Sequence, residues 1–108
     1  MAVQAVTKDT FQKEVLEHKG IVFIDFHAVW CGPCKLTDPI IDELSNEMQN
    51  IKFVKINVDE NPDLSQTYSV FSIPTFLIVN EGKIVSQFVG AMGKEGFLNE
   101  INKISSNQ

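Results

Sequence analysis

IVFIDF at residues 21–26 and WCGPC at residues 30–34 form an expected strand-to-helix junction that holds both cysteines of the chain. The apolar run has strand length, and its continuous hydrophobicity predicts burial on both faces. From Pro33 onward the pattern predicts helix, so the thiols would lie at a helix N-terminus, where unpaired N–H groups and the helix dipole favour thiolate. Lowering a thiol pKa from about 8.5 to about 7 raises the thiolate fraction at pH 7 from ~3% to about half. The junction is therefore predicted to carry a redox-active dithiol.

Length and charge limit the classes of function. The 108 residues predict a single domain spanning 1–108, long enough to bury a core without disulfide staples. The net charge is −5 and all nine basic residues are lysines, without a basic cluster. Because phosphate binding needs concentrated positive charge, nucleic acid is not expected as a partner.

Cysteine use and hydropathy predict a location. Both cysteines belong to the CxxC motif, which leaves none for a structural framework and favours a reducing compartment. No apolar stretch approaches the ~20 residues of a membrane span. Residues 1–6 lack the basic region and apolar segment of a signal peptide. We therefore expect a cytoplasmic protein that does not bind membranes.

Hydrophobic spacing along the chain predicts alternating strands and helices. The expected strands lie at 2–6, 21–26 and 51–58, and two more at 75–79 and 83–89 form a hairpin around Asn80-Glu81-Gly82 after a loop at 72–74. The first expected helix is capped by Thr7 or Asp9, runs to Lys19 with Phe11, Val15 and Leu16 on one face, and stops at Gly20; the second covers 34–48, with Leu36, Ile40, Ile41, Leu44 and Met48 at helical spacing and a kink at Pro39. A short helix runs from Asn61-Pro62 to Tyr68, and a last helix has Phe97, Leu98, Ile101 and Ile104 on its apolar side. This order predicts an α/β domain with a mixed sheet covered on both faces.

Several motifs together indicate a family. They are WCGPC at 30–34, Asp25-Phe26 before it, Lys35 and Pro39 after it, Lys55, the loop Ile73-Pro74-Thr75, Gly82 and Val89-Gly90-Ala91. With these residues the chain resembles the thioredoxin family along essentially its whole length. The resemblance implies the thioredoxin fold, a central mixed five-stranded sheet flanked by four helices. A bare CxxC motif is weaker support, because zinc sites use it too.

The two cysteines receive different expected roles. Cys31 precedes the helix, so it should be more exposed and more acidic than Cys34 and act as the nucleophile, leaving Cys34 as the resolving thiol. The alternatives are an inert pair or half of a zinc site. Zinc normally takes four ligands, and the scattered His18 and His27 are the only histidines. We therefore expect no metal.

Asp25 and Lys55 are candidates for proton handling. A carboxylate inside a buried strand is costly, and burial raises its pKa, so Asp25 is a candidate proton acceptor for Cys34. Lys55 is its candidate partner, a role that the resemblance also implies. The alternatives are that Asp25 is a tolerated polar residue of the core and that Lys55 faces solvent.

The resemblance also implies a surface that docks substrates. Pro74 resembles the family's cis-proline, although the sequence does not show the isomer and cis occurs in only about 5–6% of X–Pro bonds. It would leave the Ile73 backbone free to pair with an extended substrate. The expected apolar patch around Cys31 consists of Trp30, Gly32, Pro33, Ile73, Gly90 and Ala91. A prolyl turn remote from the site and a core tryptophan are the alternatives.

Two positions depart from the common family pattern. His27 stands where many thioredoxins have Trp, and Val29 where acidic residues are frequent. A charged His27 near pH 6.5 would favour the Cys31 thiolate, whereas a partly exposed loop histidine would have little effect.

The expected function is protein-disulfide reduction through a mixed disulfide at Cys31. The resemblance implies no bound cofactor, electrons from NADPH through a separate flavin-containing thioredoxin reductase, and disulfide substrates such as peroxiredoxins or ribonucleotide reductase. Pro33 accompanies a reducing dithiol in this family, which argues against an oxidase or isomerase. We expect a monomer. The alternative function is a non-catalytic docking subunit with the same fold.

Overall fold

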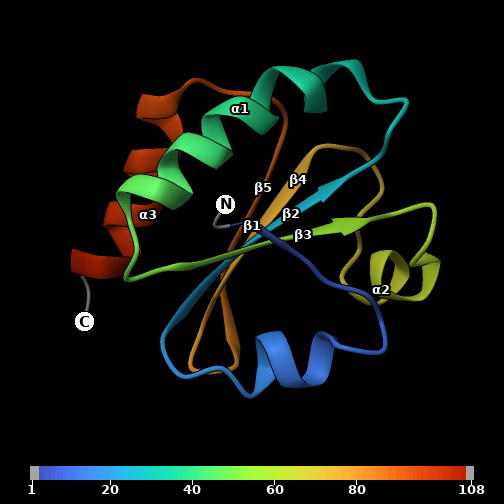
Figure 1. The fold of residues 1–108 in the computed structure, drawn as a ribbon, viewed down its shortest axis with the longest axis horizontal. Coiled ribbons are helices and arrows are strands. Elements are labelled where there is room, and N and C mark those ends of the chain that lie inside the picture. Colours follow the sequence, from blue (N-terminus) through green and yellow to red (C-terminus); the bar gives the residue numbers. More distant parts are fainter. Residues whose placement is uncertain (1–2, 107–108) are drawn as a thin grey trace.

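A computed structural model describes residues 3–106 as five strands and four helices (Figure 1). In chain order they are β1 (Val3–Ala5), the π-helix η1 (Gln12–Leu16), β2 (Ile21–His27), α1 (Gly32–Glu47), β3 (Lys52–Asn57), α2 (Pro62–Thr67), β4 (Thr75–Asn80), β5 (Lys83–Val89) and α3 (Lys94–Ser106). The predicted order of elements is confirmed. The strand expected at residues 2–6 is β1, and Ala2 lies outside the described residues.

The sheet is mixed, with strand order β1-β3-β2-β4-β5. β1 and β2 both pair with β3 in parallel, whereas β4 pairs antiparallel with β2 and with β5. Figure 1 shows α1 and α3 over one face and η1 and α2 on the other. The predicted five-stranded sheet flanked by four helices is therefore confirmed.

Strand β2 lies at the centre and is buried on both faces, as its sequence predicts. Phe23 points into the core under α1 and α3, whereas Val22, Ile24 and Phe26 belong to the core on the opposite face. Successive side chains of a strand alternate between faces, so Asp25 shares the face of Phe23 and lies toward α1.

The first predicted helix is much shorter than expected. The π-helix covers Gln12–Leu16 and follows Phe11, whose backbone is also helical. An i→i+5 hydrogen bond from the Glu17 N–H to the Gln12 oxygen closes it at 2.9 Å. Thr7 does not cap this helix but accepts a hydrogen bond from the Asp9 N–H at 3.3 Å. The Thr7 side chain therefore belongs to the turn at residues 8–10, which lies before η1.

Helix α1 begins two residues earlier than predicted, and Leu36 is not on its buried face. Cys31 is the N-cap and Pro33 occupies the first turn, where a proline is tolerated. Cys34 and Ile41 are buried, but Leu36 is 71% exposed. Leu36 follows Cys34 by two residues, about 200° around the helix, so the two cannot share a face.

The remaining connections follow their turn chemistry. The β4–β5 hairpin closes through Glu81 at φ 51° and Gly82 at φ 80°, the positive values of a two-residue type I′ turn. Asn61 precedes α2 without capping it, because its side-chain oxygen accepts from the Lys8 N–H at 2.9 Å. Within residues 3–106, no helix is both long and apolar enough to cross a membrane.

Candidate active site

The two cysteines are joined as a disulfide at the N-terminus of α1, with their Cα atoms 5.3 Å apart. The Cys31 sulfur accepts a hydrogen bond from the Cys34 N–H at 3.2 Å. This is the N-cap interaction of α1, made by sulfur in place of the usual oxygen. On reduction, the same N–H and the helix dipole would stabilise a thiolate at Cys31.

The expected difference in exposure between the cysteines is negligible in this oxidised form. Cys31 is 2% exposed and Cys34 is 1% exposed. They form a small buried cluster with Ala28, against which Val58 and Ile73 pack. These apolar neighbours cover both sulfurs, so position before the helix does not by itself expose Cys31.

The loop before β4 reaches the disulfide. The Ile73–Pro74 peptide bond is cis, Pro74 is buried, and Ile73 packs against the cysteine cluster. The Gly90 N–H donates to the Pro74 oxygen at 2.9 Å, and Gly90 takes φ 102°. The structure therefore places Ile73 against the dithiol, with Pro74 next to it in the chain and Gly90 hydrogen-bonded to Pro74. Ala91 follows on an exposed segment.

Trp30 lies on the surface rather than in the core. Its side chain is 68% exposed, and its indole N–H donates to the Asp59 carboxylate at 2.7 Å. It borders a groove of about 280 Å³ lined by Trp30, Val58, Val70, Phe71, Ser72 and Ile73. Gly32 and Pro33 are exposed at the first turn of α1.

Sequence reasoning missed four residues of the groove, Val58, Val70, Phe71 and Ser72, and also Asp59, which accepts the Trp30 hydrogen bond. Phe71 is 87% exposed, a large apolar side chain left open to solvent beside the Ile73-Pro74 loop. A phenylalanine in the segment just before that loop, outside any periodic apolar pattern, is the signal that could have found it. Asp59 could not be found in this way, because its partner Trp30 is distant in the sequence and no local pattern indicates the contact.

Asp25 is enclosed between β2 and α1. The residue is 2% exposed, and its Oδ1 has no hydrogen-bond partner among the described residues. It faces a small cavity of about 110 Å³ lined by Val3, Asp25, Asp38, Ile41, Asp42 and Lys55. Burial first, and then the negative charge of Asp38, raises the pKa of Asp25 to about 8.

Lys55 lies opposite Asp25 in the parallel register of β2 and β3, half-buried and on the same face. Its positive charge opposes the other influences and lowers the pKa of Asp25. Lys55 therefore lines the same cavity as Asp25 rather than facing only solvent. Sequence reasoning did not include Asp38 and Asp42, whose approach to Asp25 depends on the rotation of α1.

His27 is the last residue of β2 and is half-buried, not a loop residue. Burial is the largest influence and lowers its pKa; the Asp38 and Glu60 charges raise it and the Lys55 charge lowers it further. A lowered pKa disfavours the charged form of His27, which weakens the hypothesis that its charge favours the Cys31 thiolate.

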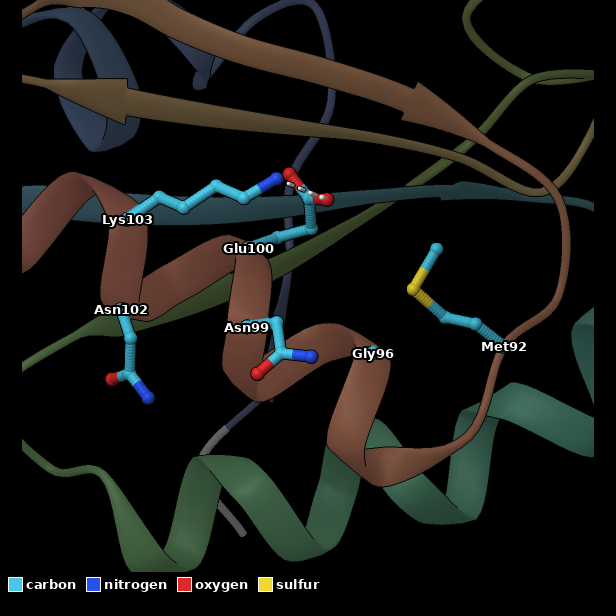
Figure 2. Close-up of a pocket in the computed structure, with 6 residues that line it drawn as sticks. All are labelled: Met92, Gly96, Asn99, Glu100, Asn102 and Lys103. Carbon is cyan, nitrogen blue, oxygen red and sulfur yellow. Dashed lines mark hydrogen bonds and ion pairs between the residues drawn. The ribbon is translucent and has the colours of Figure 1, made fainter.

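A wider hollow of about 630 Å³ lies along α3, lined by Met92, Gly96, Asn99, Glu100, Asn102 and Lys103. Figure 2 shows the Glu100–Lys103 ion pair at one end and the Met92 side chain at the other. Its lining includes no cysteine, histidine or buried carboxyl group, so the disulfide surface remains the candidate site. In the part of the chain that the structure describes, no three His, Cys, Asp or Glu side chains are grouped to hold a metal ion.

Comparison with known proteins agrees with this geometry. The family model described as Thioredoxin matches residues 2–103. Thioredoxin 1 of Synechococcus elongatus is 43% identical over 100 residues, covering 92% of this chain and 94% of the relative. Thioredoxin of Bacillus subtilis is 43% identical over 104 residues, covering 95% and 98%. Thioredoxin of Pyropia yezoensis is 40% identical over 107 residues, covering 98% and 100%.

Proposed function

Because this chain belongs to the thioredoxin family, and is thus a thiol–disulfide oxidoreductase that reduces protein disulfides, we propose the role of each site residue in that reaction. Cys31 is the attacking thiol and Cys34 the resolving thiol. The observation that carries this assignment is the hydrogen bond from the Cys34 N–H to the Cys31 sulfur at the start of α1. A group placed there is stabilised most when it carries a negative charge.

The proposed reaction has two exchange steps. The Cys31 thiolate attacks one sulfur of a substrate disulfide, forming a mixed disulfide and releasing the first substrate thiolate. Cys34 loses its proton and attacks the Cys31 sulfur, which forms the Cys31–Cys34 disulfide and releases the second thiolate. The substrate gains two electrons and the dithiol loses two.

We propose Asp25 as the group that receives the Cys34 proton. It lies on β2 under α1, is enclosed, and has an unpartnered oxygen facing a cavity large enough to admit water. With a pKa of about 8, roughly a tenth of it is carboxylate at pH 7 and can act as a base. Lys55 is its proposed partner, stabilising the carboxylate form.

Substrate docking is assigned to the surface around the disulfide. The proposed contacts are Trp30, Gly32, Pro33, Ile73, Gly90 and Ala91, with Pro74 holding the Ile73 backbone open for pairing with an extended polypeptide. The exposed Trp30 and Phe71 beside the groove support an apolar docking face.

The cellular setting is also part of the proposal. The whole chain of 108 residues acts as one domain and as a monomer in the cytoplasm, without nucleic-acid or membrane partners. The protein binds no cofactor of its own. Electrons come from NADPH through a separate flavin-containing thioredoxin reductase, and the substrates are protein disulfides such as those of peroxiredoxins or ribonucleotide reductase.

Reduction of insulin disulfides with dithiothreitol as electron donor tests the reaction. We expect the wild type to accelerate insulin precipitation and Cys31→Ser to abolish the acceleration. Cys34→Ser should accumulate a mixed disulfide with the substrate, detectable by mass, because the resolving thiol is missing. An adduct on Cys34 in the Cys31→Ser variant, together with no adduct on Cys31 in the Cys34→Ser variant, would reverse the assignment.

The redox potential of the Cys31–Cys34 pair tests whether the protein reduces or oxidises its substrates. Equilibration against glutathione and dithiothreitol buffers, followed by alkylation of free thiols and mass analysis, gives the midpoint potential of the Cys31–Cys34 pair. We expect a value well below the glutathione couple. A value near that couple would indicate an oxidase or isomerase, and the absence of any reversible transition would favour the docking subunit.

A further inference from the structure

Three side chains on α1 connect the dithiol to solvent. Cys34, Asp38 and Asp42 follow one another at intervals of four residues, so they lie on one face of the helix, one turn apart. Cys34 is 1% exposed, Asp38 is half-buried and Asp42 is exposed. The stripe thus runs from the buried sulfur through a half-buried acid to an exposed acid.

This stripe lies over Asp25. Asp38 and Asp42 line the same cavity of about 110 Å³ as Asp25, and Ile41 lines it too. The unpartnered Oδ1 of Asp25 is the buried polar atom of that cavity, which is large enough to admit water. The carboxyl group of Asp25 on β2 therefore shares one small space with two carboxyl groups of α1, the half-buried Asp38 and the exposed Asp42.

We propose that Asp38 is a positioning residue for the second exchange step: its carboxylate, one helical turn from Cys34 and across the cavity from Asp25, governs the pH at which Asp25 takes the Cys34 proton. The proposal rests on the proposed function, because it extends the role assigned there to Asp25. Two carboxyl groups in one confined space do not both ionise readily, so a charged Asp38 keeps the proton on Asp25.

The charges around Asp25 support this choice. From α1 it faces Asp38 and Asp42, and from β3 it faces Lys55. His27 follows on its own strand, β1 contributes the apolar Val3, and β4 places the apolar Phe76 opposite Asp25. After burial itself, the Asp38 charge is the largest influence that raises the Asp25 pKa, and Asp42 contributes least.

The consequence is that the second exchange step, the attack of Cys34 on the mixed disulfide, is slowed at neutral pH. The Cys34 proton moves to the Asp25 carboxylate, the Cys34 thiolate attacks the Cys31 sulfur, and the substrate thiolate leaves. Asp25 must lose its own proton to solvent before it can act, and the neighbouring negative charge delays that loss to higher pH. Removing the Asp38 charge is therefore expected to make the base available at lower pH.

The substitution Asp38→Asn tests the proposal, since it removes the charge and keeps the size. The first readout is the pH titration of the Asp25 carboxyl carbon by NMR in the reduced protein. The second is the reaction with an aromatic disulfide whose thiolate absorbs visible light. Its first thiolate is released by Cys31 attack and its second by Cys34 attack, so the second phase isolates resolution.

In Asp38→Asn we expect two midpoints to fall by roughly one pH unit, because a neighbouring like charge is lost. They are the midpoint of the Asp25 NMR titration and the midpoint of the pH dependence of the second-phase rate. The second phase at pH 7 should become about two- to fivefold faster, in proportion to the larger fraction of Asp25 carboxylate. Asp63→Asn, which removes an exposed acid from the first turn of α2, is the charge-matched control and should shift neither midpoint. Asp38→Glu should restore midpoints close to those of the wild type.

Unchanged midpoints in a folded Asp38→Asn protein would overturn the proposal, as would an equal shift in Asp63→Asn. Thermal unfolding of each variant establishes that it is folded. The pH dependence of the second phase in Asp25→Asn separates the role proposed for Asp25, as the base for Cys34, from the role proposed for Asp38, as the charge that acts on Asp25. If that dependence persists without Asp25, the role proposed for Asp25 fails, whatever Asp38 does to the NMR titration.

Discussion

At the scale of a residue, Asp25 makes the stability of the protein depend on pH. Its pKa is about 8 in the folded protein and about 4 in the unfolded chain, so the folded state binds its proton more tightly. The stabilisation is complete below pH 4 and is lost as the pH rises through 8. At that point the buried carboxylate costs on the order of several kcal/mol.

Asp25→Asn is therefore expected to stabilise the protein more at alkaline than at acidic pH. The difference in free energy of unfolding between variant and wild type should grow from pH 4 to pH 8 and then level off. Urea denaturation at four or five pH values measures it. Because only the change with pH matters, the contacts of the new amide cancel, and a flat difference would contradict the pKa of Asp25.

At the scale of an element, the β4–β5 hairpin depends on Gly82 for two reasons. Gly82 has φ 80°, and a Cβ there would lie 2.7 Å from the Leu16 backbone oxygen. Gly20 has φ 102° but open space around its Cβ position, and Gly93 has open space and no positive φ. These three glycines separate backbone strain from steric overlap.

We expect Gly93→Ala to change the free energy of unfolding by less than ~0.5 kcal/mol. Gly20→Ala should destabilise by about 1 kcal/mol through strain alone, and Gly82→Ala by about 2–4 kcal/mol because overlap with fixed backbone adds to it. Chemical denaturation measures all three. Equal losses at Gly20 and Gly82 would mean that the hairpin moves away from Leu16 freely.

The elements also show how far a sequence can be interpreted alone. The IVFIDF run and the WCGPC motif predicted β2, α1 and the dithiol because their signals are local periodicity and spacing. Leu36 was misplaced because several apolar residues of α1 fit more than one helical face. Asp38 was missed because its effect requires α1 to be packed on β2, a contact between distant segments.

At the scale of the whole molecule, β2 joins two cores that lie on opposite faces of the sheet. Phe23 packs against the rings of Phe53, Phe76, Phe88 and Phe97 on one face. Phe26 lies in the other core with Val22 and Leu77. Because one strand belongs to both cores, we expect the two cores to unfold together.

Phe23→Ala and Phe26→Ala are each expected to lower the free energy of unfolding by about 3–5 kcal/mol within a single cooperative transition. Far-UV and near-UV circular dichroism in urea should give coincident curves. Val85→Ala, at an exposed position of the edge strand β5, is the control and should cost less than ~0.5 kcal/mol. Separate transitions for the two probes would show that the cores unfold independently.

Trp30 gives the molecule an optical reporter of its own. It is the only tryptophan in the chain, and it lies on the surface beside Cys31 with its indole N–H bonded to Asp59. Its emission therefore reports on the disulfide's surroundings rather than on the core. A polypeptide docked over the groove will shield the indole from iodide quenching, so occupancy of this surface can be followed in the unlabelled protein.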